Sequence, residues 1–423
     1  MQIKISNIGK IKEAEVTING ITVIAGENNT GKSTVGKALY AMFNSFVDVK
    51  QTVDEERIGS LRRTLNVFAN ELDSFGFTKF DVQKIAVKLN EDRSKITKEK
   101  LAEFLRKEFN YENNKLDINQ NALKSTIDKL MRILEITDEY YTRTLTQKIF
   151  GEEFKQQINN TLEKEAGYVQ LTIKKYVSKV HFDNDIALKV SKSIDIFNKA
   201  IYLDDPFVLD RGPVNGVFPK IFKRNAYYGH QDSLCELIYG NQEDYNLVDK
   251  IVADERLQKI MSKMQIACKG NVFFKDNGEL LYQQNNVSVP FKVANLSTGL
   301  KSFAILQTLL LNGAIKDGSL IILDEPEIHL HPEWQLLFAE LIVMLQKEFN
   351  LHILLNTHSP YFLQAIEVFA EKYGINDKCE YYLSYNEHEE SFVKPVTGNL
   401  EEIYAKLARP LQVLENLRYA DDK

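Results

Sequence analysis

A glycine-rich segment near the start of the chain has the composition of a phosphate-binding loop. The segment reads Gly26-Glu27-Asn28-Asn29-Thr30-Gly31-Lys32-Ser33 and matches the pattern G-x-x-x-x-G-K-[ST] at every position. In this pattern the glycines let successive backbone N–H groups reach a phosphate, the lysine binds the β- and γ-phosphates, and the serine hydroxyl binds Mg²⁺. The segment and the following Thr34 are therefore predicted to bind a nucleoside triphosphate with Mg²⁺.

Two carboxylates follow an apolar run in the last third of the chain. Leu320-Ile321-Ile322-Leu323 has the composition of a buried strand, and Asp324 and Glu325 come directly after it. At the end of such a strand, Asp324 can help to hold Mg²⁺ through water, and Glu325 can polarise the attacking water as a general base. The alternative is a strand that ends in acidic residues by chance, and the presence of Pro326 and His358 disfavours it.

The residues around the glycine-rich segment predict the strand, loop and helix order that phosphate binding requires. Three β-favouring runs come before the segment, at residues 3–8, 13–18 and 21–25. After it, apolar residues recur with helical spacing at Val35, Ala38, Leu39 and Met42. A helix is thus expected to begin at the end of the loop, where its N-terminus favours an anion.

The second half of the chain alternates between strand and helix patterns. A hairpin is predicted over 169–182, and further strands are predicted at 200–203, 270–274, 279–283, 320–323 and 352–355. Helices are predicted over 299–311 and 332–347. This order predicts an α/β fold with a mainly parallel core sheet, and an amphipathic tail over 400–417, interrupted at Pro410, that packs on the body.

Residues 48–165 differ from both flanking regions, because they are rich in Lys, Glu, Asn and Leu and contain helical stretches at 98–109 and 121–134. A solvated helical insertion is the simpler interpretation, and a docking surface for a partner protein is the alternative. The predicted divisions of the chain are therefore 1–47, 48–165 and 166–423.

Charge, cysteine content and hydrophobicity narrow the classes of protein to which the chain can belong. The net charge of −6 gives no support to attraction of the whole molecule to nucleic acid, although it leaves a local basic groove open. The three cysteines are scattered, with no C-x-x-C pair, so a disulfide scaffold or a zinc site is not expected. Because there is no signal-peptide pattern and no apolar run of membrane-spanning length, a cytoplasmic protein without a membrane partner is expected.

Four motifs together resemble the ABC-type ATPases: residues 26–33, Leu296-Ser297-Thr298-Gly299, Leu323-Asp324-Glu325-Pro326 and Thr357-His358-Ser359. Within that class the chain resembles the branch of OLD-type ATPases, RecF and the SMC proteins. Its opening segment 5–14, the Gly26-Glu27-Asn28-Asn29 form of the loop and the segment 324–332 are most similar to the OLD-like subgroup. The resemblance covers about residues 1–45 and 168–415 and implies an α/β ABC-type head with a mixed sheet core, an antiparallel β lobe and a helical insertion.

The resemblance also implies roles for residues outside the loop. Ser297 and Gly299 would cap the γ-phosphate of ATP held by another protomer, so that two protomers form two composite sites. His358 would contact the γ-phosphate, and the catalytic set would be Lys32, Glu325 and His358. The glutamine that links Mg²⁺ to the outer lobe in relatives has no clear counterpart, since the expected loop holds Asp204 and Asp205, and Gln231 is a weak alternative.

His329 and His331 leave three interpretations open. A His-x-His pair near Asp324 and Glu325 can chelate a transition metal. The resemblance instead implies a loop that crosses a dimer interface, and a purely structural role is the third interpretation. Trp334, in the helix that follows, is expected to be part of the core.

ATP hydrolysis does not by itself define a biological output. OLD-like ATPases act in anti-phage defence, and the chain resembles the stand-alone ATPase subunits of Septu and PARIS systems, because it leaves no room for a TOPRIM nuclease before Lys423. This interpretation implies a homodimer or larger assembly that controls a separate effector, expected to be a nuclease. A DNA-repair ATPase of the RecF or SMC kind is the alternative, although long coiled coils and a zinc hook are not indicated, and a transporter ATPase fits the architecture less well.

Overall fold

The computed structural model describes residues 1–72, 81–109, 120–162, 165–191, 194–212, 229–240, 247–275 and 278–420. These residues form two compact units. The sheet unit contains residues 1–47 and the described residues from 146 onward, and the helical unit contains the described residues between 48 and 145. The predicted divisions at 47 and 165 stay a prediction.

One eleven-stranded sheet runs through the sheet unit. Its strands, in spatial order, are β6 (Ile186–Ser191), β5 (Tyr176–Asp183), β4 (Gly167–Ile173), β1 (Gln2–Ile8), β2 (Ile11–Thr17), β14 (Glu390–Pro395), β13 (Cys379–Glu387), β3 (Ile21–Gly26), β12 (His352–Thr357), β11 (Leu320–Asp324) and β7 (Ile201–Leu203). The two ends of the chain therefore meet in the middle of the sheet, where β14 pairs with β2 and β13 pairs with β3.

The direction of the strands changes across the sheet. From β13 through β3, β12 and β11 to β7, every neighbouring pair is parallel. From β2 through β1, β4 and β5 to β6, every pair is antiparallel, and short turns connect β1 to β2, β4 to β5 and β5 to β6. The prediction of a mainly parallel sheet is therefore wrong for the sheet as a whole and right for the half that carries the glycine-rich loop. The expected α/β class, with a mixed sheet, an antiparallel lobe and a helical insertion, is confirmed.

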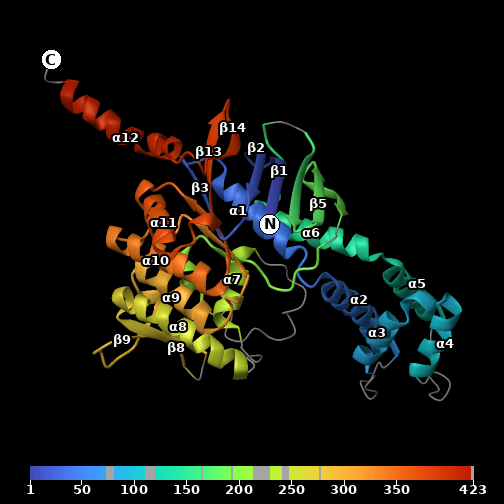
Figure 1. Cartoon of the computed structure of the whole chain (residues 1–423). Helices are drawn as coiled ribbons and strands as arrows, with labels where there is room; N and C mark the ends of the chain where they lie inside the picture. Colours follow the sequence, from blue (N-terminus) through green and yellow to red (C-terminus); the bar gives the residue numbers. More distant parts are fainter. Residues whose placement is uncertain are drawn as a thin grey trace. The chain divides into compact units, whose positions relative to one another are not determined.

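Helices cover both faces of the central parallel strands, which explains why β3, β7 and β11 are apolar for most of their length. Alternate side chains, such as Ile321 and Leu323, join one core with α9 (Thr298–Leu311), α10 (Pro332–Phe349) and α11 (Pro360–Tyr373). Figure 1 shows these helices stacked next to one another. The opposite side chains face α1 (Lys32–Asn44), where a Cβ at Gly36 would lie 3.1 Å from the Tyr202 ring.

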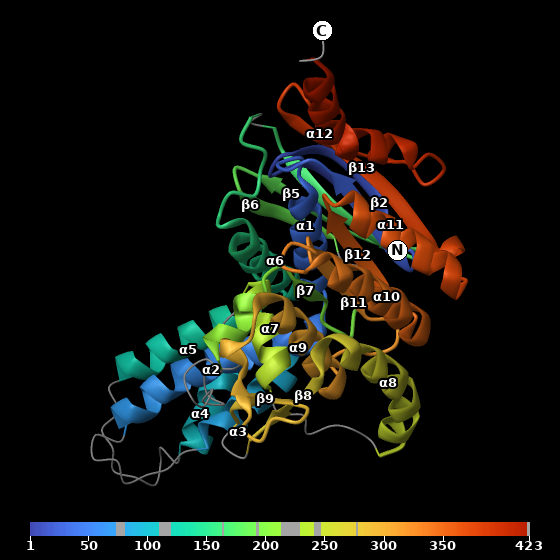
Figure 2. The same ribbon diagram turned by 90° about the vertical axis from the view of Figure 1, so that its left-hand side faces the viewer.

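The remaining elements of the sheet unit extend the layer of α9. Helix α8 (Leu247–Cys268) packs on α9 and α10, and α7 (His230–Tyr239) packs on β7. A separate three-stranded antiparallel sheet, formed by β8 (Gly270–Phe274), β9 (Leu280–Gln284) and β10 (Phe291–Lys292), adjoins α8 and α9 (Figure 2). Cys235 in α7, Cys268 in α8 and Cys379 in β13 are buried free thiols.

Among the side chains described in the C-terminal tail, those that pack on the core lie at its start. Helix α12 (Glu401–Ala420) buries Ile403 against the core and then leads away from the sheet (Figure 1). The helix continues through Pro410, which the sequence analysis expected to interrupt it, and Val413, Leu414 and Leu417 are exposed. Among the residues that the structure describes, no helix is long and apolar enough to cross a membrane.

The helical unit has its own core. It contains α2 (Val49–Leu72), α3 (Val82–Glu91), α4 (Lys98–Glu108), α5 (Gln120–Glu135) and the first part of α6 (Asp138–Phe154). Leu61, Leu65, Leu101 and Leu130 are buried together in it. The two helices predicted within 48–165, at 98–109 and 121–134, are confirmed as α4 and α5.

Candidate functional site

The glycine-rich segment joins β3 to α1 and cannot carry larger residues at two of its positions. Gly26 ends β3 beside β13, and a Cβ there would lie 2.3 Å from the carbonyl oxygen of Ser384. Gly31 precedes α1 with a φ of 85°, a left-handed conformation that favours glycine. The loop therefore presents its backbone at the N-terminus of a 13-residue helix, where the helix dipole and free N–H groups favour phosphate.

Strand β13 supports this loop from the side. The Ser384 hydroxyl donates a hydrogen bond to the carbonyl of Thr30, and Asn386 Nδ2 donates to the carbonyl of Asn29 at 3.3 Å. Within the loop, the buried Thr30 hydroxyl donates to the Glu27 carbonyl at 2.8 Å. Ser384 and Asn386 were not predicted as site residues, because nothing in their local pattern shows that β13 lies next to β3.

Lys32 places a buried ammonium group at the centre of the loop. Its Nζ donates to the carbonyls of Gly26 at 3.0 Å and Glu27 at 2.8 Å, and it lies 3.4 Å from Oε1 of Glu325. The loop is thereby connected to the acidic end of β11, as the motif spacing predicts. A cation at this position can neutralise the charge on transferring phosphate groups.

Asp324 is buried at the end of β11, and each of its oxygens accepts a hydrogen bond. Tyr202 donates its hydroxyl to Oδ2 at 2.8 Å, and Asn356 donates Nδ2 to Oδ1 at 2.9 Å and also to the Lys32 carbonyl at 3.1 Å. Burial and the neighbouring Asp324 raise the pKa of Tyr202 well above its usual value, so the phenol remains a hydrogen-bond donor. Tyr202 and Asn356 were not predicted as site residues, because their contacts with Asp324 depend on β7 and β12 being the neighbours of β11.

Glu325 has a backbone conformation that is uncommon for its residue type. Its φ is 51°, and its N–H donates to the Asn356 carbonyl at 2.9 Å. The side chain is turned so that Oε1 lies 3.3 Å from Nδ1 of His358 as well as close to Lys32. The structure thus brings together the three residues that were predicted to be catalytic, and their roles stay a prediction.

Glu327 is a buried carboxylate beside this group that the sequence analysis did not assign. Its Oε1 accepts hydrogen bonds from the Thr357 hydroxyl and from the backbone N–H of His358, the latter at 3.3 Å. Its other oxygen has no hydrogen-bond partner among the described residues. Burial raises the pKa of Glu327 despite these hydrogen bonds. Glu327 therefore anchors the backbone that carries His358.

Ser33 and Asp324 fit the predicted Mg²⁺ site in their chemistry. Ser33 is the exposed second residue of α1, and Asp324 ends a strand that is separated from β3 only by β12. Hydroxyl and carboxylate oxygens are the ligands that Mg²⁺ prefers, and each Asp324 oxygen keeps a lone pair beyond the one that its hydrogen bond uses. These residues would hold the ion, with Thr34 next in the helix.

The signature residues form a different group. Ser297 is exposed directly before α9, and a Cβ at Gly299 would lie 3.0 Å from the His329 carbonyl. Around them is a cavity of about 530 Å³, and it is lined by Ser297, Thr298, Gly299, His329, His331 and Trp334. The structure places Ser297 and Gly299 with this set and not with Lys32, Glu325 and His358.

The two histidines of the segment 324–332 have separate surroundings. The His329 ring lies edge-on to Phe207 with centroids 5.9 Å apart, and His331 comes directly before α10. Within the described ranges, no group of three or more His, Cys, Asp or Glu residues is arranged to hold a metal ion. Trp334 is half-buried, since it packs edge-on against Phe303 and also lines the signature cavity.

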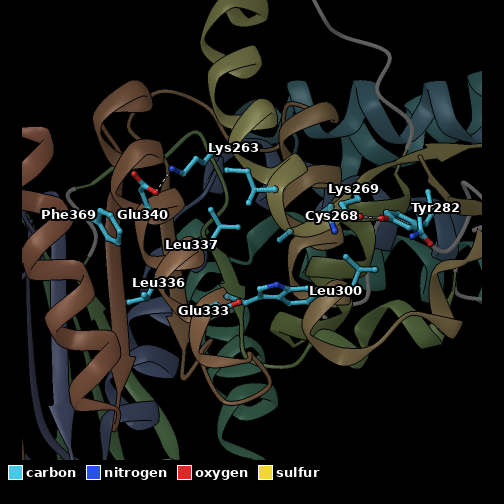
Figure 3. A pocket seen from close by; sticks show the side chains of 14 residues that line it. Lys263, Cys268, Lys269, Tyr282, Leu300, Glu333, Leu336, Leu337, Glu340 and Phe369 are labelled. Carbon is cyan, nitrogen blue, oxygen red and sulfur yellow. Dashed lines mark hydrogen bonds and ion pairs between the residues drawn. The ribbon is translucent and has the colours of Figure 1, made fainter. Parts of the chain in front are cut away.

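A further cavity, of about 630 Å³, lies between α8, α10 and β9 (Figure 3). Glu340 lies in it and accepts hydrogen bonds from Lys372 and Tyr373, while Lys263 is 2.6 Å away. Although burial opposes the change, these three partners lower the pKa of Glu340. Leu300, which follows Gly299 directly, and Trp334 also line this cavity, so it adjoins the signature segment.

Comparison with known proteins identifies the family. Residues 21–364 match the family described as "AAA domain, putative AbiEii toxin, Type IV TA system". The chain belongs to this AAA-domain family. The matched residues include the glycine-rich loop, the segment 296–299, Asp324, Glu325 and His358.

Several solved structures are similar over nearly the whole of this AAA-domain chain at low sequence identity. The SMC head domain from Thermotoga maritima is 12% identical with a TM-score of 0.39, and the match covers 93% of this chain and 98% of that one. The SmcHead bound to the C-winged helix domain of ScpA is 10% identical with a TM-score of 0.46 over 95% and 98%. The Smc head domain with an extended coiled coil, bound to the C-terminal domain of ScpA derived from Pyrococcus furiosus, is 9% identical with a TM-score of 0.42 over 99% and 98%.

Proposed function

We propose that the chain is an ATPase subunit that binds ATP with Mg²⁺ and hydrolyses it to ADP and phosphate. The observation that carries this proposal is the joint contact of Lys32, Glu325 and His358 at the end of the glycine-rich loop. Lys32 would bind the β- and γ-phosphates, and Ser33 and Asp324 would hold Mg²⁺. Bound Mg²⁺ would neutralise the charge that develops on the phosphate oxygens.

Other residues of the site would have separate roles in the reaction. Glu325 is partly exposed beside the loop, where a carboxylate can accept a proton from water as that water attacks the γ-phosphate. His358, held through its backbone N–H by Glu327, would contact the γ-phosphate from the other side of Glu325. Asn356 ties Asp324 to the Lys32 carbonyl, and this contact keeps the metal-binding carboxylate in register with the loop.

The separation of the signature residues from the loop supports a site that two protomers complete. Ser297 and Gly299 line their own cavity with His329 and His331, and they would cap the γ-phosphate of ATP bound to a second copy. The chain would therefore act as a homodimer or a larger assembly. In this arrangement His329 and His331 lie in the loop that crosses between protomers.

The family description supports a role beside a separate partner. It refers to a putative AbiEii toxin and to a Type IV TA system. Together with the OLD-like motifs, it favours a cytoplasmic ATPase subunit of the Septu or PARIS kind, which senses a trigger and regulates or scaffolds a nuclease effector in anti-phage defence. Purification with the product of the neighbouring gene, followed by mass measurement with and without ATP, tests this role. An adjacent membrane permease would contradict it.

The ATPase proposal itself is tested with purified protein. Phosphate release should depend on Mg²⁺, and Lys32→Ala should abolish ATP binding, whereas Lys189→Ala, which changes an exposed lysine on β6, should leave it unchanged. A Lys32→Ala protein that binds ATP as tightly as the unmodified chain would refute the site.

A further inference from the structure

The His230 ring lies between two carboxylates from different elements. Its Nδ1 is 2.7 Å from Oε2 of Glu153, near the end of α6, and its Nε2 is 2.8 Å from Oδ2 of Asp204, directly after β7. Glu153 also accepts the backbone N–H of His230 at 2.7 Å, and so it satisfies a free donor at the start of α7. We call these three residues, Glu153, Asp204 and His230, the histidine clamp.

The clamp has strong contacts because it is shielded from water. The Glu153 side chain is fully buried, and the His230 side chain is 11% exposed. Burial opposes protonation, but hydrogen bonds to Asp204 and Glu153 raise the pKa of His230 to about 9. At neutral pH both ring nitrogens therefore donate, and each contact is a charge-assisted hydrogen bond.

The clamp reaches the nucleotide site through Tyr202. The rings of His230 and Tyr202 are 4.4 Å apart, and Tyr40 of α1 lies edge-on to both, at 6.0 Å and 5.9 Å. Tyr202 is thus enclosed by the clamp on one side and by α1 on the other, where Gly36 leaves room for its hydroxyl. From this position the hydroxyl donates to Oδ2 of Asp324 at 2.8 Å.

The clamp also occupies a second carboxylate close to the predicted metal site. Leu203 and Leu323 are paired residues on the parallel strands β7 and β11, so Asp204 and Asp324 follow at equivalent positions on neighbouring strands. His230 and Gln231 both contact Oδ2 of Asp204. These two contacts fix the orientation of the Asp204 carboxylate on the strand next to Asp324, while its Oδ1 has no hydrogen-bond partner among the described residues.

We propose that His230 is a positioning residue for the Mg²⁺ site, because with Asp204 and Glu153 holding its ring it fixes Tyr202 against Asp324. The proposal rests on the proposed ATPase function and adds a residue that acts on Mg²⁺ binding without touching nucleotide. The alternative is that His230 has a purely structural role and only anchors the start of α7. A structural role predicts lower stability with unchanged Mg²⁺ dependence, whereas positioning predicts a change in Mg²⁺ dependence.

The test compares ATP hydrolysis at a range of Mg²⁺ concentrations for the full chain and for Asp204→Asn, His230→Gln and Tyr202→Phe. Asp204→Asn is the main variant, because it leaves the contact of Glu153 with the start of α7 intact. Each change is expected to raise the Mg²⁺ concentration for half-maximal rate by about fivefold to tenfold, the effect of weakening one hydrogen bond to a charged group, with kcat within about threefold. His181→Gln, an exposed histidine on β5, is the matched control and should behave as the unmodified chain.

Coupling between the residues provides a second measurement. If His230 acts through Tyr202, the double variant His230→Gln/Tyr202→Phe should have the same Mg²⁺ requirement as Tyr202→Phe alone. Additive effects, or an unchanged Mg²⁺ requirement in folded Asp204→Asn, would overturn the proposal. Should the unmodified chain show no hydrolysis, the ATPase proposal fails, and the clamp is then tested by the Mg²⁺ dependence of binding of a fluorescent ATP analogue to the same variants.

Discussion

Lys32 Nζ and Glu325 Oε1 lie 3.4 Å apart, and this contact joins the glycine-rich loop to the end of β11. The two residues are far apart in the sequence and meet because β3 and β11 both neighbour β12 in a parallel sheet. In such sheets ligands bind at the carboxyl ends of the strands, which is where both residues lie. The contact also means that a change at Glu325 alters the surroundings of the Lys32 ammonium group.

Glu325→Gln should reduce ATP hydrolysis by about a hundredfold or more, because glutamine cannot accept the proton of the attacking water. Nucleotide should remain bound, and the protein should accumulate as an ATP-bound dimer when mass is measured with ATP and Mg²⁺. Glu371→Gln, which changes an exposed carboxylate on α11, is the control. A normal rate of hydrolysis in Glu325→Gln would remove Glu325 from the mechanism.

Glu327→Ala should destabilise the fold and slow hydrolysis. The substitution leaves the Thr357 hydroxyl and the His358 N–H without their common acceptor, at a cost of roughly 1–3 kcal/mol in the free energy of unfolding. Glu327→Gln is the matched variant, since it keeps an acceptor oxygen and removes a charge whose burial is unfavourable. Denaturant unfolding of both variants measures the difference in stability. Equal stability of the two variants would show that the hydrogen bonds accepted by Glu327 do not stabilise the fold.

Gly26→Ala should disrupt the loop. Its Cβ would lie 2.3 Å from the backbone oxygen of Ser384, and a backbone atom in the middle of the sheet cannot move aside easily. We expect a loss of about 2 kcal/mol or more in the free energy of unfolding, together with weaker ATP binding. Gly398→Ala is the control, because no atom lies within 4 Å of its added Cβ.

The stability of the protein should depend on the charge of His230. Its pKa is raised from 6.5 to about 9, so its contribution is complete below pH 6.5 and is lost as the pH rises through 9. The groups that face it are Glu153 on α6, Asp204 after β7 and the rings of Tyr40 and Tyr202. Relative to His230→Gln, the unmodified chain should lose roughly 2–3 kcal/mol of unfolding free energy over this window. Thermal unfolding across the pH range measures the difference, and parallel curves for the two proteins would contradict it.

The motif residues of the site could be predicted from the sequence, and the residues that hold them could not. Lys32, Asp324 and Glu325 follow a glycine pattern and a buried strand, and both signals are local. Tyr202 and Asn356 act through strand neighbours, and a single sequence does not give the order of strands in a sheet. The same limit explains β13, which was not predicted although it lies beside the loop, because its tyrosine-rich pattern gives no hint of its partners.

The prediction of a mainly parallel sheet was wrong for the sheet as a whole for a related reason. The alternation of helix and strand after residue 299 predicts parallel pairing correctly for β11 and β12. The sequence predicts β1 and β2 as separate short strands and β4 with β5 as a hairpin, and it does not predict β6. Only the folded chain shows that these antiparallel strands extend the same sheet. Hydrophobic periodicity identifies which face of a strand is buried but not which strand lies beside it.

A mixing experiment tests whether two protomers complete each site. Ser297→Arg should block the signature surface while leaving the protomer's own loop intact. Lys32→Ala should inactivate the loop while leaving the signature surface intact. Each variant alone should therefore be inactive. In a heterodimer of the two, one composite site combines an intact loop with an intact signature. Random mixing in equal amounts makes half of the dimers heterodimers with one working site each, so about a quarter of the unmodified rate should return. Recovery of hydrolysis on mixing requires that Ser297 of one copy serves the loop of another, and no recovery between folded, dimerising variants would place the complete site within one chain.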